Sequence, residues 1–168
     1  MADRSTGWVR VHADVMPLLG LAASKDVENI DGAWDVENPA CFPAEPQNII
    51  VLQGNDFPGG ILEDLESFLK KRKIPFDAEW EGFSGSYDAG SSYFRFNEKG
   101  EMLPAIVCLE GQGSISYRDL LAMVEEKGVD ALLDHAEKMK IKTFPAVALQ
   151  DAPLPNIQRL MDEIEKGE

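Results

Sequence analysis

Cysteine and histidine are scarce in this sequence of 168 residues, which has two of each. Cys41 and Cys108 lie far apart and in no C-x-x-C spacing, so we expect no disulfide framework and a cytoplasmic location. Cys108 lies in an apolar run, which disfavours a nucleophilic role. His12 and Asp14 share a strand face, but one histidine and one carboxylate are too few for a zinc site. We therefore predict no catalytic residue, no metal and no cofactor.

Long apolar runs and nucleotide-binding motifs are also missing. No run of apolar residues is long enough to cross a bilayer, so we expect no membrane association. The segment Val15–Ser24 is interrupted by Pro17, and we interpret it as mature structure rather than as a signal peptide. The Gly/Ser-rich segment 82–92 lacks the lysine of a phosphate-binding loop and precedes a strand pattern, not a helix. Nor does the sequence contain G-x-S-x-G or H-E-x-x-H.

Basic residues are too few to balance the acids: 16 Lys and Arg stand against 30 Asp and Glu, a net charge of −14. A protein with this charge repels phosphate backbones, so we predict no direct binding to nucleic acid. The same charge attracts a protein with a basic surface. Many cytoplasmic proteins carry a similar excess of acids for solubility alone, which is the alternative explanation.

The hydrophobic pattern favours one globular α+β domain over residues 1–168, with a mixed, mostly antiparallel sheet covered by helices on one face. Residues 7–15 and 75–82 alternate polar and apolar side chains, as half-buried strands do. We also expect strands at 48–54, 91–102 and 143–149, a short edge strand at Ala33–Glu37, and a central strand at 104–111. Helices are predicted at Ile61–Lys73, 114–128, Val129–Lys140 and 155–167.

The first part of the predicted site is a row of acids on the strand at 75–82. Asp77, Glu79 and Glu81 point to one side, and Trp80 points to the other side with the apolar residues of the core. Such a row suits a basic partner or, with ligands from other elements, a divalent metal ion. A solvated sheet face without a ligand is the simplest alternative.

The second part of the site is the Gly/Ser-rich loop that follows. Phe83 and Tyr87 have no periodic reason to lie in the core, and Asp88 adds a charge beside them. We therefore predict that this loop and the acidic row bind a basic-surfaced protein, as inhibitors, immunity proteins and DNA mimics do. The alternatives are a small metal-dependent hydrolase that uses the acidic row with His12, and a small-molecule sensor built on the loop Asp31–Gln47.

Overall fold

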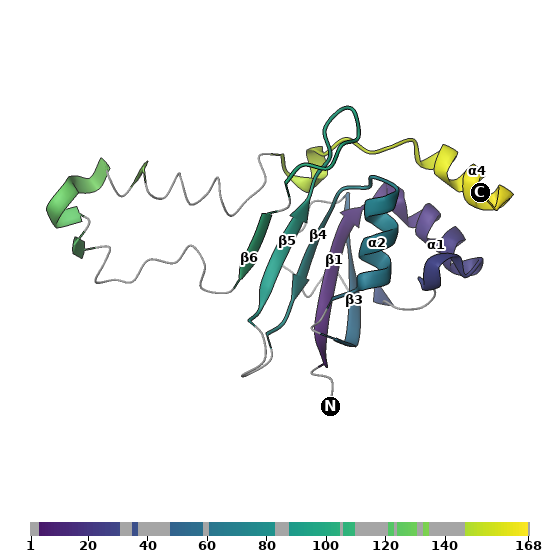
Figure 1. Cartoon of the computed structure of the whole chain (residues 1–168), viewed down its shortest axis with the longest axis horizontal. Helices are drawn as coiled ribbons and strands as arrows, with labels where there is room; N and C mark the ends of the chain where they lie inside the picture. Colours follow the sequence, from purple (N-terminus) through teal and green to yellow (C-terminus); the bar gives the residue numbers. More distant parts are fainter. Residues whose placement is uncertain are drawn as a thin grey trace.

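A computed structural model describes residues 4–30, 35–36, 48–58, 61–82, 88–104, 106–109, 121–122, 124–130, 133–134 and 147–167. Within them one six-stranded sheet has the order β2-β3-β1-β4-β5-β6, and every pairing is antiparallel (Figure 1). The strands are β1 (Arg4–His12), β2 (Asp35–Val36), β3 (Ile49–Pro58), β4 (Phe76–Trp80), β5 (Gly90–Phe94) and β6 (Ile106–Leu109). The α-helices that contribute to the core are α1 (Met16–Ser24), α2 (Glu63–Lys71) and α4 (Ile157–Lys166), and the 3-10 helices are η1 (Ala13–Val15), η2 (Val27–Asn29) and η4 (Leu149–Asp151).

One face of the sheet forms the hydrophobic core with α1, α2 and α4. Val9 of β1 pairs with Leu52 of β3 and with Ala78 of β4, so these apolar side chains share a face. That face packs against buried leucines and isoleucines of the helices. Figure 1 shows α1, α2 and α4 grouped on one side of the sheet. The predicted α+β class with helices on one face is confirmed, although the described sheet is wholly antiparallel rather than mixed.

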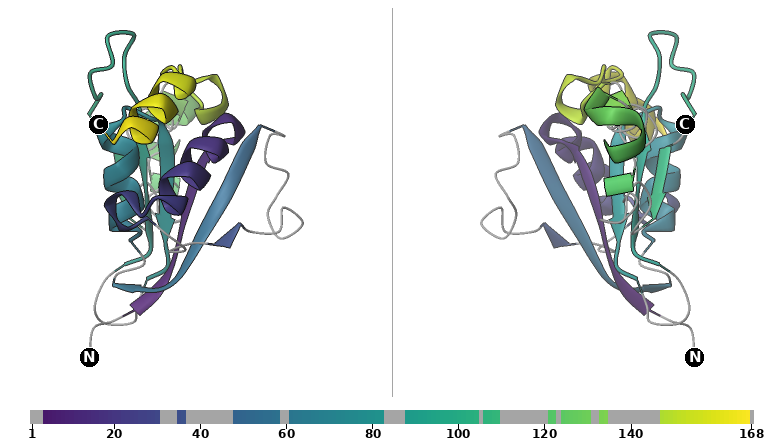
Figure 2. Two further views of the ribbon diagram at one scale, coloured as in Figure 1. Left: turned by 90° about the vertical axis from the view of Figure 1, so that its right-hand side faces the viewer. Right: turned by 90° about the vertical axis from the view of Figure 1, so that its left-hand side faces the viewer.

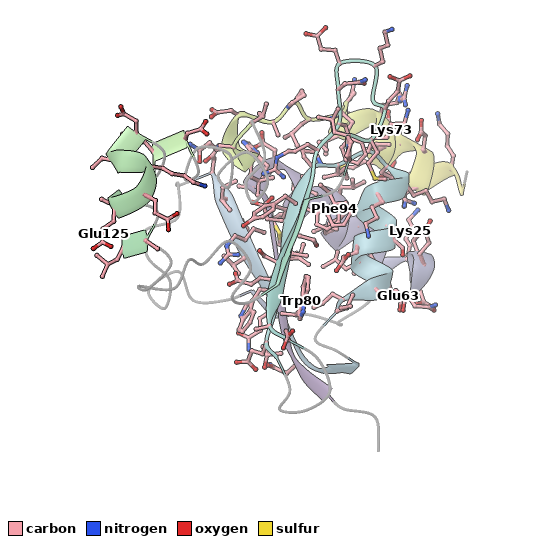
Figure 3. All side chains as sticks on the ribbon, turned by 60° about the vertical axis from the view of Figure 1, so that its left-hand side comes forward. Lys25, Glu63, Lys73, Trp80, Phe94 and Glu125 are labelled. Carbon is pink, nitrogen blue, oxygen red and sulfur yellow. The ribbon has the colours of Figure 1, made fainter. Side chains whose placement is uncertain are left out.

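Helix α2 illustrates how the sequence builds this layer. Leu65, Phe68 and Leu69 recur at helical spacing and are buried, whereas acids occupy the first turn and lysines the last. Beneath it, Phe76 and Phe94 stack with ring centroids 4.3 Å apart. Figure 3 shows Phe94 on the side of the sheet next to α2. The lysines in the last turn of α2, Lys70 and Lys71, lie where they complement the helix macrodipole.

Two predicted strands differ from the observed ones in length or in neighbours, and a third is confirmed. The strand expected to end at Gly54 continues to Pro58, because β1 extends to Arg4 and pairs with it beyond a bulge near Gly7. The apolar run expected to form a central strand is β6, which has only β5 beside it among the described strands. The edge strand expected near residue 35 is confirmed as β2, which lies outside β3 in Figure 2.

The predicted helices after β6 fall only partly within the described residues. Residues 121–122, 124–130 and 133–134 are helical, and Figure 1 shows them away from the sheet. Gly128, the predicted helix end, has a φ of +80°. Val129 and Leu133, two of the apolar residues of the helix predicted at Val129–Lys140, are 59% and 61% exposed. In the described part of the chain, no helix has the length and apolar character needed to span a bilayer.

Candidate functional site

The face of the sheet opposite α1, α2 and α4, here called the open face, carries two rows of side chains that run across the strands. The antiparallel register places Trp8 beside Gln53 and Glu79, and Glu79 beside Ser91. The second row contains Val51, Arg10, Asp77 and Tyr93. All of these side chains except Val51 are partly exposed, as expected for a sheet face on which none of the described α-helices packs.

Two arginines hold the carboxylates of the open face. The Arg10 Nη1 atom lies 2.6 Å from Glu79 Oε2, and the Arg95 Nη1 atom lies 2.6 Å from Asp77 Oδ1. Both distances are typical of strong charge-assisted hydrogen bonds. The acidic row on β4 is therefore largely neutralised by arginines from β1 and from the residue that follows β5, and this part of the face is not a bare acidic surface.

Arg95 also joins the sheet to the segment that contains η4. Its side chain is 5% exposed, and its Nη1 atom donates to the carbonyl oxygens of Phe76 and Phe94 at 3.1 and 2.9 Å. Its Nε atom donates to the carbonyl oxygen of Val147 at 3.0 Å. The guanidinium thus ties the segment that contains η4 to the end of the open face at which Asp77 lies.

The aromatic side chains of the open face are held by hydrogen bonds. Trp8 Nε1 donates to Gln53 Oε1 at 3.3 Å, and Ser91 Oγ donates to Tyr93 Oη at 3.3 Å. Each contact joins residues that the register or the period of two places on the same face. The aromatic rings are therefore restrained before any ligand binds.

The predicted site residues are brought together only in part. Asp77 and Glu79 share the open face as predicted, and Glu81 follows the end of β4 as an exposed residue whose amide donates to the carbonyl of Thr6 at 3.0 Å. Asp88 is exposed just before β5. The predicted loop anchors Phe83 and Tyr87, and most of the loop Asp31–Gln47, lie outside the described residues.

Trp80 does not lie in the core as expected. It points to the helix-covered side by alternation with Phe76 and Ala78, but it is only partly buried. Its Nε1 atom donates to the carbonyl of Asp88 at 3.0 Å, and Figure 3 shows it at the lower end of the sheet. Trp80 therefore joins the end of β4 to the residues just before β5, next to the loop that connects these strands.

The described part of the chain contains no group of three or more His, Cys, Asp and Glu placed to hold a metal ion. His12 is engaged at the start of η1, where its Nδ1 accepts from the amide of Asp14 at 3.3 Å. Its Nε2 lies 3.0 Å from Asn48 Nδ2. These contacts give His12 a role in capping a helix, and the structure does not gather it with Asp77 and Glu79 into a metal-binding cluster.

A second group of charges lies where α2 ends beside η2. Glu28 accepts from Lys71 at 2.8 Å and from Arg72 at 3.2 Å. Partial burial raises the pKa of Glu28, but the two hydrogen bonds outweigh it, so this pKa lies below its ordinary value. Burial of Glu66 raises its pKa, and Lys70, 3.1 Å away, offsets that rise only in part. The ionised Glu28 carboxylate therefore stabilises the helix layer, whereas ionisation of the buried Glu66 carboxyl destabilises it. Both residues lie away from the open face.

Sequence reasoning missed Trp8, Arg10, Tyr93 and Arg95 as members of the site. The alternation of polar and apolar residues in β1 places Trp8 and Arg10 on a polar strand face. Only the order of the strands shows which acids lie beside them. Cross-strand pairs join residues far apart in the chain, as Arg10 and Glu79 are. No local spacing could have shown that pair.

The fold and the face together define an α+β protein in which three α-helices cover one side of an antiparallel sheet, while a polar and aromatic face remains on the other. Comparisons of the chain with protein-family models, with curated proteins and with solved structures give no match. A fold by itself does not specify a function, so the indications of function lie in the residues of this face and in the charge of the chain.

Proposed function

We propose that this chain is a non-enzymatic binding protein, of the kind represented by inhibitors, immunity proteins and DNA mimics, and that it acts in the cytoplasm on a protein with a basic surface. The observation that carries the proposal is the open face, where Trp8 and Arg10 lie on β1 and Tyr93 of β5 lies in the same row as Arg10, with Asp77 of β4 between them. Trp, Tyr and Arg are the residues that contribute most to binding energy at protein interfaces.

The net charge of −14 supports a basic partner through its long-range field. Asp77 and Glu79 contribute little to that field because Arg95 and Arg10 pair with them. Asp88 is exposed at the hairpin end of the sheet, where a carboxylate can accelerate association. The predicted partner-binding set also includes Glu81, which is exposed at the same end, and Phe83 and Tyr87, which are proposed as loop anchors.

The experiment is capture of a partner from an extract of the native host on the immobilised chain. One wash contains about 0.1 M salt and a second about 1 M salt, which shortens the Debye length from ~10 Å to ~3 Å. Proteins held by charge are released in the second wash, whereas proteins held by apolar contacts remain bound. We expect a basic protein that is identified by mass spectrometry and then binds the purified chain saturably, with an association rate that falls as salt rises. If every retained protein binds without saturation, the chain is not a partner-specific binding protein.

A further inference from the structure

The centre of the open face combines aromatic rings with charges that are already neutralised. Trp8 and Tyr93 occupy adjacent rows, and between them the Arg10–Glu79 pair crosses the strands at 2.6 Å. A partner that covers this pair meets no uncompensated charge there. The aromatic rings and the flat guanidinium offer contact area at a low cost in desolvation.

The side chains of this centre are held before binding. Trp8 donates to Gln53, Ser91 donates to Tyr93, and Arg10 donates to Glu79. Ordering a side chain at an interface costs free energy, and contacts that exist in the unbound protein remove part of that cost. The β-strands on which these residues lie add the rigidity that a loop lacks.

Exposed acids lie at both ends of the face. Glu81 and Asp88 flank the hairpin between β4 and β5, and the Asp14 side chain is 72% exposed beside His12 at the opposite end of β1. An interface with an apolar, aromatic centre and a charged rim is the usual anatomy of protein complexes. The complementary surface has an apolar centre and a rim of Lys and Arg.

From this arrangement we infer that Trp8 and Tyr93, with the Arg10–Glu79 pair between them, are the binding centre for a protein that presents an apolar patch ringed by basic residues. The inference rests on the proposed function and adds residues from β1 and β5 to the predicted acidic row and loop. It makes the sheet face the source of affinity, and it leaves the acids to set the association rate.

The test measures binding of the purified partner, identified as described above, to matched variants of the full chain. Ser91→Lys places a positive charge and added bulk within the first row, whereas Ser24→Lys makes the same change at the exposed end of α1 on the helix side. We expect Ser91→Lys to raise the dissociation constant at least about tenfold, and Ser24→Lys to leave it unchanged. Trp8→Ala should raise it about thirtyfold, mainly through faster dissociation.

Each variant is first compared with the unchanged chain by circular dichroism and thermal melting, and Tyr93→Ala replaces Trp8→Ala if the latter does not fold. Folded variants at Ser91 and Trp8 that bind the partner as the unchanged chain does would overturn the inference and leave the proposed function standing. Recovery of nucleic acid in place of a protein would overturn the choice of partner. Failure to obtain any saturable protein partner would overturn both proposals.

Discussion

Arg95 is the residue on which the end of the sheet depends most. Its guanidinium satisfies two backbone carbonyls of neighbouring strands, one carbonyl of the η4 segment and the carboxylate of Asp77. Removing the arginine takes one donor from each of these acceptors in a largely buried setting. A buried acceptor that loses a donor costs more than the lost contact itself.

We therefore expect Arg95→Met to lower the free energy of unfolding by about 3 kcal/mol, the lower range for a broken buried ion pair, since Asp77 keeps some contact with water. Urea denaturation followed by circular dichroism measures the change. The control is Arg159→Met, which breaks an exposed pair with Glu163 on α4 and should cost well under about 1 kcal/mol. Equal losses in the two variants would show that Arg95 is no more than a surface residue.

Glu28 and Glu66 give opposite predictions for pH. The pKa of Glu28 is lowered in the folded chain, so its contribution to stability is present above the carboxyl's unfolded pKa and is lost as the pH falls through the folded pKa. Glu28→Gln should therefore lower stability at pH 7 by up to about 1 kcal/mol, with a difference that shrinks in acid. Unfolding measured from pH 7 down to about pH 3 tests this, across the ordinary carboxyl range.

Glu66 is the matched control for that experiment because its pKa is raised by burial. Its ionisation costs the folded state stability as the pH rises through the folded pKa. Glu66→Gln should therefore gain stability relative to the unchanged chain as the pH rises. If both variants changed in the same direction with pH, the two carboxyl environments described above would be wrong.

At the scale of the element, β4 shows how one strand carries two kinds of residue on its covered side. Phe76 is fully buried and stacks on Phe94, whereas Trp80 is partly exposed near the end of the strand. Phe76→Ala should cost about 3–5 kcal/mol, as truncations of buried aromatics do, and Trp80→Ala distinctly less. Chemical denaturation of both variants measures this, and a larger loss for Trp80→Ala would place the core at the wrong end of β4.

The faces of individual strands could be predicted from the sequence, because side chains alternate strictly along a strand. The alternation around Trp8, Val9, Arg10 and Val11 gave the buried and polar faces of β1 correctly, and the same rule placed Asp77 and Glu79 together. The apolar stripe of α2 could also be predicted, because Leu65, Phe68 and Leu69 recur at helical spacing. In each case the information lies within a few neighbouring residues.

The order and neighbours of the strands could not be predicted in this way. β1 lies between β3 and β4, and only this order brings Arg10 to Glu79. The apolar run at 104–111 was assigned to a central strand because continuous apolar strands are usually buried on both faces. An apolar sequence indicates that both faces of a strand are buried, but it does not show how many strands are hydrogen-bonded to it. Among the described strands, β6 pairs with β5 alone. The site was missed for the same reason, since it is made across strands.

At the scale of the whole molecule, the exposed aromatic sheet face favours binding to nucleic acid, whereas the net charge of −14 opposes it. An exposed sheet with Trp, Tyr and Arg has side chains of the kind that stack on single-stranded nucleic acid. The arginines of this face, however, donate to Glu79 and Asp77, and the net charge of −14 surrounds them with a field that repels phosphate. Affinity for nucleic acid depends largely on Lys and Arg contacts that release counterions. The architecture alone therefore does not make this face a nucleic-acid platform.

We accordingly predict no measurable binding to duplex DNA or to single-stranded RNA. The measurement is fluorescence anisotropy of a labelled oligonucleotide of about 16 nucleotides, the upper site size for one sheet-based single-strand module, with the protein raised to micromolar concentration. Low salt, about 0.05 M, gives electrostatic binding its best chance, because screening is weakest there. The Trp8→Ala chain serves as the matched control. Saturable binding that weakens with salt and disappears in Trp8→Ala would assign the open face to nucleic acid, since stacking on Trp8 would then have outweighed the repulsion of the whole molecule.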